Sequence, residues 1–228
     1  GRKAWCAGAP FLSHALVTAW ENERGPFLIK VPLTQRHLRI VNEQCQAIGL
    51  TDTALCEVLF DAAAGELIGD ERSYLARVGY WHSAAGTAAC WYGGAQAIAH
   101  KLCEHLHAYP SARNAHAFAH LGAIDIALQQ SAALLQKTAS WIDANPYAPA
   151  IEPALRVRGA VEATAREVLD RAGRVVGAAP YCEDAQFARL AADLPVYLRH
   201  SQAERDLAQL GQQIANNYRH AGLPAWAL

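Results

Sequence analysis

A polar cluster in the last third of the chain holds the residues best suited to acid–base chemistry. It comprises Arg199, His200, Ser201, Glu204, Arg205 and Asp206. Histidine titrates near neutral pH, and a carboxylate beside it orients the imidazole as a general base. His200 and Glu204 are four residues apart, so on a helix they would share one face. The alternative is a solvent-exposed helix face whose charges form ion pairs, and the sequence leaves that alternative open.

Histidines near the middle of the chain have the spacing of a metal-binding pair. His116 and His120 are four residues apart on a predicted helix, and further polar residues precede them: His100, Glu104, His105 and His107. Two histidines on one helix face can bind a metal ion. No glutamate follows His116, so the HExxH pattern is absent. We therefore interpret these residues as surface histidines and predict no metal.

The first predicted helix begins at Arg77, one of few charges in an apolar segment. A charge among aromatic residues needs a partner, so Arg77 is either an active-site cation or a paired surface residue. This helix also has an aromatic face, which either packs in the hydrophobic core or lines the site of a flat cofactor. The face consists of Tyr80, Trp81, Trp91 and Tyr92. Another flank of the helix carries only small residues, among them Gly86, Gly93 and Gly94. Small residues allow tight helix packing or the close approach of a ligand or a second subunit.

The elements that position these residues follow from the hydrophobic patterns. Before residue 70, short β-branched and aromatic runs predict strands over 14–19, 27–31, 38–41 and 55–60. After it, Ala- and Leu-rich segments separated by Pro and Gly predict helices over 77–107, 112–144, 152–171 and 182–220. Long helices with short connections pack as antiparallel neighbours. The sequence therefore predicts a mainly α fold: a four-helix up-and-down bundle (70–228) preceded by a partial, mostly antiparallel β domain (1–69).

The predicted helix over 152–171 shows the amphipathic pattern most clearly. Leu155, Val161 and Ala165 form its apolar face. Arg158 and Glu162 fall mostly on the other side, which predicts that both face solvent.

Composition excludes several classes of function. The chain has 228 residues, 52% of them apolar, enough for a sizeable core. The balance of 20 Lys and Arg against 21 Asp and Glu argues against a nucleic-acid partner, which would need a basic face. No apolar run reaches the roughly 18 residues of a membrane span. Six cysteines without a CxxC pair favour a reduced, cytoplasmic protein with buried thiols. Because the sequence has no Met and begins inside a strand-like pattern, we expect a piece of a longer chain, with the N-terminal part of the β domain missing.

Several segments, in this order, resemble the acyl-CoA dehydrogenase family over nearly the whole chain. The first eight residues, GRKAWCAG, are similar to the family's G-x-K-x-W-I-T-x-G strand in the middle β domain. Arg77 stands where the family has an Arg at a helix start. Gly177 falls on the first Gly of Q-x-x-G-G-x-G, with Arg174 at the Gln position. The four residues HSQA at 200–203 fall on Y-E-G-T.

The resemblance implies a flavoprotein oxidoreductase with FAD as cofactor and an acyl-CoA or related thioester as substrate. Oxidation would occur at Cα–Cβ with FAD as the hydride acceptor. Trp5 would pack on the flavin, and Arg174 and Gly177 would contact the cofactor. The helical bundle would mediate self-association, as it commonly does in the family.

The sequence departs from the family pattern at the catalytic base. In many members the Glu of Y-E-G-T removes the α-proton of the thioester, but here that position is Ser201, whose hydroxyl is too weak a base unaided. In other members the catalytic Glu stands just before the Arg at the helix start. In this sequence that position is Ala76, so the alternative base is absent too. We nominate His200 as the replacement base, oriented by Glu204, with the thioester entering toward Arg77.

Two other contacts that the resemblance implies are also absent. Ala7 replaces the hydroxyl-bearing residue near the flavin. The R-x-x-F-G segment, which contacts FAD across the subunit interface, does not occur between His107 and His120. Two alternatives to the dehydrogenase therefore stay open. One is a flavin-dependent monooxygenase of the same fold, which needs no α-proton base, and the other is a non-catalytic subunit that kept the bundle.

Overall fold

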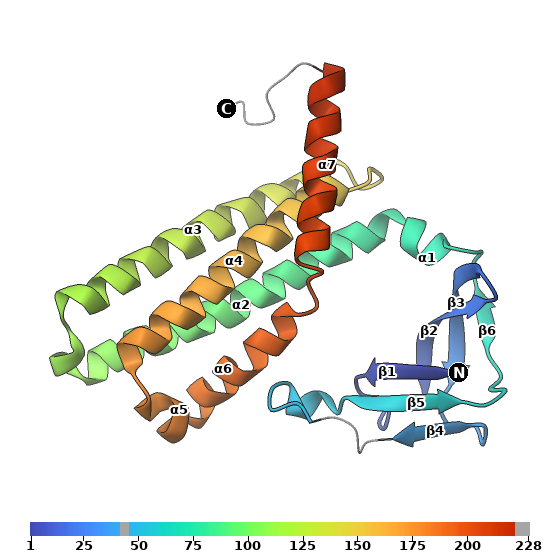
Figure 1. Cartoon of the computed structure of the whole chain (residues 1–228), viewed down its shortest axis with the longest axis horizontal. Helices are drawn as coiled ribbons and strands as arrows, with labels where there is room; N and C mark the ends of the chain where they lie inside the picture. Colours follow the sequence, from blue (N-terminus) through green and yellow to red (C-terminus); the bar gives the residue numbers. More distant parts are fainter. Residues whose placement is uncertain (42–45, 222–228) are drawn as a thin grey trace. The chain divides into compact units, whose positions relative to one another are not determined.

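The computed structural model describes residues 1–41 and 46–221 (Figure 1). The chain divides into two compact units, unit 1 over Gly1–Tyr80 and unit 2 over Trp81–Leu228. Unit 1 contains the strands, and unit 2 contains the long helices. The predicted fold class, a helical bundle preceded by a partial antiparallel β domain, is confirmed.

Unit 1 contains two antiparallel sheets of three strands each within its described residues. In one sheet, β5 (Cys56–Phe60) lies between β1 (Arg2–Cys6) and β4 (Leu38–Val41). In the other, β3 (Arg24–Pro32) lies between β2 (His14–Glu21) and β6 (Glu66–Ile68). The four predicted strands correspond to β2 to β5. The three-residue β6 is too short to leave an alternating pattern in the sequence.

The short helix α1 (Ser73–Ala76) belongs to unit 1 because the residues before it bind β3. The backbone N–H of Gly25 donates to the carboxylate of Glu71 over 2.9 Å. The guanidinium of Arg72 donates to the carbonyl of Gly25 over 3.2 Å. The change in composition predicts a domain boundary near residue 70. In the structure unit 1 extends to Tyr80 and so includes these bonds and α1.

In unit 2, four helices enclose one apolar core: α2 (Val78–Ala108), α3 (Ala115–Ala144), α4 (Ile151–Val176) and α6 (Ala185–Leu198). Trp91, Ile124, Val161 and Leu198 come from these four helices in turn and are almost wholly buried. The side chain of Asn114 caps α3 by accepting two backbone N–H bonds. The predicted breakers do separate the helices, and Pro110 begins a 3₁₀ turn, Pro110–Ala112, between α2 and α3. None of the described helices combines the length and apolarity needed to cross a membrane.

The prediction of one helix over 182–220 is wrong, because this segment forms three helices. They are α5 (Ala179–Glu183), α6 and α7 (Glu204–Ala221). Asp184 ends α5 and caps α6, its carboxylate accepting the N–H groups of Gln186 and Phe187. After Leu198 the chain leaves the helix, and Ala203 takes a positive φ of 41°. Figure 1 shows α7 crossing α4 at an angle to the bundle.

The expectation of buried thiols holds for only part of the chain. All five described cysteines are free; Cys56 is buried and Cys6 half-buried. Cys90, Cys103 and Cys182 are exposed, because each falls on the solvent side of its helix. The sixth, Cys45, lies outside the described residues.

The glycine-rich flank of α2 has two different environments. A methyl group added at Gly94 would meet the Cδ1 atom of Leu194 at 3.1 Å, so this glycine lets α6 approach closely. Added at Gly86 or Gly93 it would meet nothing within 4 Å. Tight packing within the chain therefore accounts for Gly94, and self-association through the flank stays a prediction.

Candidate functional site

The turn between α6 and α7, residues 199–203, carries the polar cluster found in the sequence. The N–H groups of Arg199, His200 and Ser201 donate to the carbonyls of residues 196–198, which closes the turn. The hydroxyl of Ser201 accepts the N–H of Ala203 over 3.0 Å. This local bond is a usual serine turn motif, and it uses one acceptor site of the hydroxyl that the sequence resemblance places at the position of the family's base.

Arg158 of α4 fixes this turn from inside the bundle. Its guanidinium donates to the carbonyl of His200 and to that of Ala84 in α2, each over 3.2 Å. It lies 3.5 Å from the carboxylate of Asp206 in α7, and it stacks over the ring of Trp91 at 4.7 Å. The residue is only 8% exposed, which contradicts the prediction that it faces solvent.

Glu162, one helical turn further along α4, makes a second anchor. Its carboxylate pairs with Arg199 at 3.1 Å and also with Arg166. Glu162 is 6% exposed, so the solvent-facing prediction is wrong here too. Arg158 and Glu162 are buried because the turn and α7 cover the side of α4 on which they lie, and paired charges tolerate burial. The two residues that position the turn are therefore not identified by the sequence pattern.

His200 and Glu204 do not share a helix face, because His200 lies in the turn and Glu204 begins α7. Both side chains are exposed. The imidazole meets the ring of Tyr197 edge-on, with ring centres 5.4 Å apart. Among the described residues no hydrogen bond or ion pair joins His200 to Glu204. An exposed imidazole can exchange protons with a ligand, and here no carboxylate orients it.

Arg77, the third predicted catalytic residue, belongs to unit 1 rather than to unit 2. Its guanidinium lies 4.7 Å from the ring of Tyr74, a cation–π contact, and the residue is exposed. Its role toward a substrate stays a prediction.

Trp5 is a large apolar side chain that unit 1 leaves exposed. It lies in β1 with a positive φ of 63°, at an irregularity in the pairing with β5 between Lys3 and Cys6. Its side chain is 76% exposed although the residue is large and apolar. An accessible indole of this kind fits stacking on a planar ring system, such as the flavin that the resemblance implies.

Arg174 and Gly177 lie at the C-terminal end of α4. Gly177 ends the helix with a positive φ of 69°, the usual role of glycine at this position. Arg174 is exposed and pairs with Asp170 at 2.9 Å on the same helix. The two residues are therefore close in the fold, and the guanidinium already has an anionic partner.

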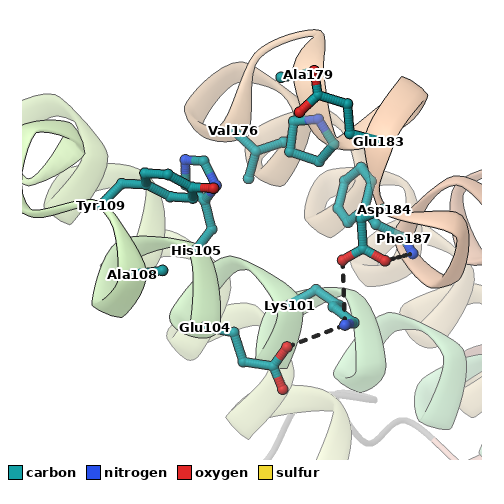
Figure 2. Close-up of a pocket in the computed structure, with 11 residues that line it drawn as sticks. Lys101, Glu104, His105, Ala108, Tyr109, Val176, Ala179, Glu183, Asp184 and Phe187 are labelled. Carbon is teal, nitrogen blue, oxygen red and sulfur yellow. Dashed lines mark hydrogen bonds and ion pairs between the residues drawn. The ribbon is translucent and has the colours of Figure 1, made fainter.

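A pocket of about 560 Å³ lies beside this helix end (Figure 2). Val176 and Ala179, on either side of Gly177, belong to its wall. The facing wall comes from Lys101 and His105 in the last turns of α2 and from Tyr109, the residue after the helix. Carboxylates contribute much of the polar lining: Glu104, Glu183 and Asp184.

Lys101 and Asp184 connect the two walls of the pocket. The ammonium of Lys101 lies 3.2 Å from Glu104 and 3.3 Å from Asp184 (Figure 2). Hydrogen bonds to Glu104 and then to Asp184 raise the pKa of Lys101 above its usual value. The N–H of Phe187, followed by Lys101, holds the pKa of Asp184 below its usual value. The pair therefore stays charged at neutral pH and ties α2 to the start of α6.

The histidine pair of α3 serves packing and surface contacts. His116 is exposed, and His120 accepts a hydrogen bond from Arg171 over 3.3 Å. Across residues 1–41 and 46–218, no three His, Cys, Asp or Glu side chains gather as a metal ion would require.

No protein-family model and no curated protein matches the sequence. Solved structures share its fold. KijD3, solved with FMN and a dTDP-linked amino-keto sugar, matches 95% of this chain and 58% of its own at 20% identity, with a TM-score of 0.79. Dibenzothiophene monooxygenase from Paenibacillus sp. A11-2 matches 98% of this chain and 64% of its own at 16% identity, with a TM-score of 0.76.

Butyryl-CoA dehydrogenase from Megasphaera elsdenii matches 94% of this chain and 59% of its own at 14% identity, with a TM-score of 0.79. The predicted resemblance is thereby confirmed at the level of the fold, which is that of the acyl-CoA dehydrogenase-like flavoproteins. The chain spans about three-fifths of the length of these structures.

Proposed function

We propose that this chain is part of a flavin-dependent oxidoreductase and that its reaction is a monooxygenation. The α6–α7 turn carries the proposal. A dehydrogenase needs a base that removes the α-proton of the thioester. At this turn Ser201 stands where the resemblance places the family's catalytic glutamate. Its hydroxyl is too weak a base unaided, and it accepts a hydrogen bond from the N–H of Ala203. A flavin-dependent monooxygenase needs no base at this turn to remove a substrate proton. The turn with Ser201 is therefore compatible with monooxygenation.

The flavin part of the proposal is supported by Trp5 and by the fold. The exposed indole would stack on the flavin ring. Flavin supplies redox chemistry that the side chains lack, including reaction of its reduced form with oxygen. KijD3 and dibenzothiophene monooxygenase, which share the fold, have been solved with FMN. FAD is the form that the sequence resemblance implies.

The residues of the turn would then bind and orient a substrate. His200 presents an exposed imidazole, which would donate or accept one hydrogen bond. Arg158 binds the backbone of the turn and Glu162 binds the side chain of Arg199, so they would fix the position of His200 without touching the substrate.

A second candidate function is α,β-dehydrogenation of an acyl thioester with His200 as the base. The exposure of the imidazole at the turn favours it, because a ligand would reach this ring directly. Glu204 would have to rotate toward His200 to orient it.

Anaerobic titration of the flavin-loaded protein with butyryl-CoA separates the two reactions. Monooxygenation predicts that the visible flavin absorbance stays unchanged, whereas a dehydrogenase would bleach it. Bleaching that is lost in His200→Ala would overturn the monooxygenase proposal and establish His200 as the base. Bleaching that persists in His200→Ala would reject both assignments.

The positive test for monooxygenation uses an external reductant, isotopically labelled oxygen and a panel of aromatic and amine substrates. Transfer of labelled oxygen to a product, above the level with free reduced flavin, is expected. A protein that binds no flavin at all would instead support the non-catalytic alternative.

A further inference from the structure

Two free cysteines of unit 1 lie directly opposite one another on neighbouring strands. Cys6 ends β1 and Cys56 begins β5, and the antiparallel pairing of the two strands sets them in register. The thiol of Cys56 donates to the main-chain carbonyl of Cys6 over 3.0 Å. Fifty positions separate the two residues in the sequence, so it is the fold of unit 1 that brings them together.

The spacing of paired strands suits a covalent bond between these two residues. Residues directly opposite one another in an antiparallel pair have Cα atoms about 4.5–5.5 Å apart. A disulfide joins residues whose Cα atoms are about 4.4–6.8 Å apart. A bond between Cys6 and Cys56 therefore requires the two side chains to turn toward one another, while the strands keep their positions.

A bulge in β1 sets this alignment. Between the paired positions on either side, Ala4 and Trp5 oppose the single residue Glu57. Successive side chains of a strand point to opposite faces, so the extra residue moves Cys6 to the face on which Cys56 lies. Trp5 provides the left-handed residue of the bulge, with a φ of 63°. The irregularity that exposes Trp5 is thus the same one that aligns the two thiols.

The two thiols share one apolar environment. Cys56 is 5% exposed and belongs to a buried cluster with Ala9, Leu33 and Val58, and the half-buried Cys6 packs against this cluster. Burial raises the pKa of both thiols, so both are protonated at neutral pH. A small oxidant from solution reaches Cys6 first, because Cys56 lies deeper.

We propose that Cys6 and Cys56 form an oxidation site, at which hydrogen peroxide converts the two thiols into a cross-strand disulfide. The thiolate of Cys6 attacks one oxygen of the peroxide, the O–O bond breaks, and a sulfenic acid and one water result. The thiolate of Cys56 then attacks the sulfur of Cys6, the S–O bond breaks, and the oxygen leaves as a second water. Two thiols and one peroxide thus give one disulfide and two waters, and the peroxide takes up the two electrons that the sulfur atoms lose.

The bond would hold β1 at its bulge. Within the described residues β1 lies at the edge of its sheet and pairs with β5 alone. A strand at an edge opens more easily than one between two neighbours. A disulfide at Cys6 would tie down the residue after Trp5 and would keep the indole in the bulge. The inference concerns unit 1 by itself and does not depend on a bound flavin.

Mass spectrometry of the folded, peroxide-treated protein tests the proposal. Trypsin leaves Cys45 and Cys56 on one peptide, 40–72, because no Lys or Arg separates them. The variant Cys45→Ser removes this ambiguity. We expect peptide 4–24, which contains Cys6, to appear linked to peptide 40–72 in most molecules. The linked mass should be two hydrogen atoms below the sum, and dithiothreitol should separate the peptides. A low protein concentration prevents links between molecules.

Two controls use the same background. With Cys56→Ser added, Cys6 has no opposing thiol, so its sulfenic acid should proceed to the sulfinic acid. In the second control the oxidation is repeated in urea, where the register of the strands is lost. Cys6 should then link to the other cysteines of the chain about as often as to Cys56.

Hydrogen exchange measures the effect on the strand. The amides of residues 2–6 should exchange about tenfold or more slowly after oxidation, and the difference should vanish on reduction. A disulfide that leaves this exchange unchanged would contradict the hold on β1.

The remaining outcomes decide whether the oxidation site exists. Linkage of Cys6 to Cys56 in the folded protein, lost or scrambled in urea, would support it. Sulfinic acid at Cys6 beside a free Cys56 would overturn it. It would equally be overturned if both thiols stayed reduced after the exposed cysteines of unit 2 had been oxidised, or if the link formed to the same extent in urea.

Discussion

The guanidinium of Arg158 donates to the main-chain carbonyl of His200 over 3.2 Å, across 42 residues of sequence. One side chain in the middle of α4 thus fixes the backbone of the turn that carries the candidate chemistry. The same guanidinium also contacts Asp206, so it fastens the chain on both sides of the break between α6 and α7.

Replacing Arg158 by Ala should destabilise the protein by about 3–5 kcal/mol, since it leaves a largely buried carboxylate at Asp206 without its partner. Arg158→Lys should recover only part of the loss, because an ammonium cannot reproduce the planar set of donors. Urea unfolding measures both. Arg166→Ala is the control, because Arg166 is half-exposed and its loss should cost about 0.5 kcal/mol or less. Equal losses in Arg158→Ala and Arg166→Ala would contradict the anchoring role.

Two neighbouring glycines of α2 should respond differently to the same substitution. Gly93→Ala should stabilise the helix by about 1 kcal/mol, because alanine has the higher helix propensity and open space surrounds the new methyl. Gly94→Ala gains the same propensity but presses on Leu194 at 3.1 Å, which should cancel or reverse the gain. Thermal melts of both variants check this. Destabilisation by Gly93→Ala at high but not low protein concentration would instead reveal self-association through this flank.

The capping aspartate Asp184 predicts a specific loss of stability in acid. Its pKa is lowered in the folded state from an ordinary value of 3.8, first by the N–H of Phe187 and also by Lys101. A lowered pKa contributes stability that is fully present above the ordinary value and disappears as pH falls through the folded value. Asp184→Asn keeps the cap but removes the charge. The wild-type advantage over Asp184→Asn should be constant above about pH 5 and fade below about pH 4. An advantage that persists undiminished at lower pH would contradict the assignment.

Thiol reactivity should follow the exposure of the cysteines. Cys90, Cys103 and Cys182 should react rapidly with iodoacetamide in the native protein. Cys56 should react only after unfolding, because burial limits access and raises its pKa, which lowers the reactive thiolate fraction. Peptide mass spectrometry after timed labelling distinguishes the sites. Rapid native labelling of Cys56 would contradict the packing of unit 1.

Much of the fold follows from local patterns in the sequence. Proline and glycine separate the helices, and alternating apolar runs define the strands that become β2 to β5. The break near residue 200 was missed because no glycine or proline occurs over 199–203. The spacing of Ser201 and Glu204 was a usable signal, because serine followed three residues later by glutamate often begins a helix.

The anchors of the turn were missed for a different reason. Because they are charged and fall mostly opposite the apolar face, Arg158 and Glu162 are predicted to face solvent. Their positions nevertheless share a helical stripe with Leu155 and Ala165, at separations of three, seven and ten residues from Leu155. The stripe is buried, and the charges on it have partners from α7 and from the turn. Those partners lie some 40 residues away, so helical periodicity alone does not identify them.

The spacing of Arg158 and Glu162 has a consequence for motion. Because the two lie one turn apart on the same helix, the α6–α7 turn is tied to α4 at adjacent points. Local opening of the turn would then require both ties to break together, so residues 199–203 should exchange amide hydrogen at the slower pace of α4. Fraying that starts further along α7 would end at Asp206, and the turn would keep its shape while the helix beyond it unwinds.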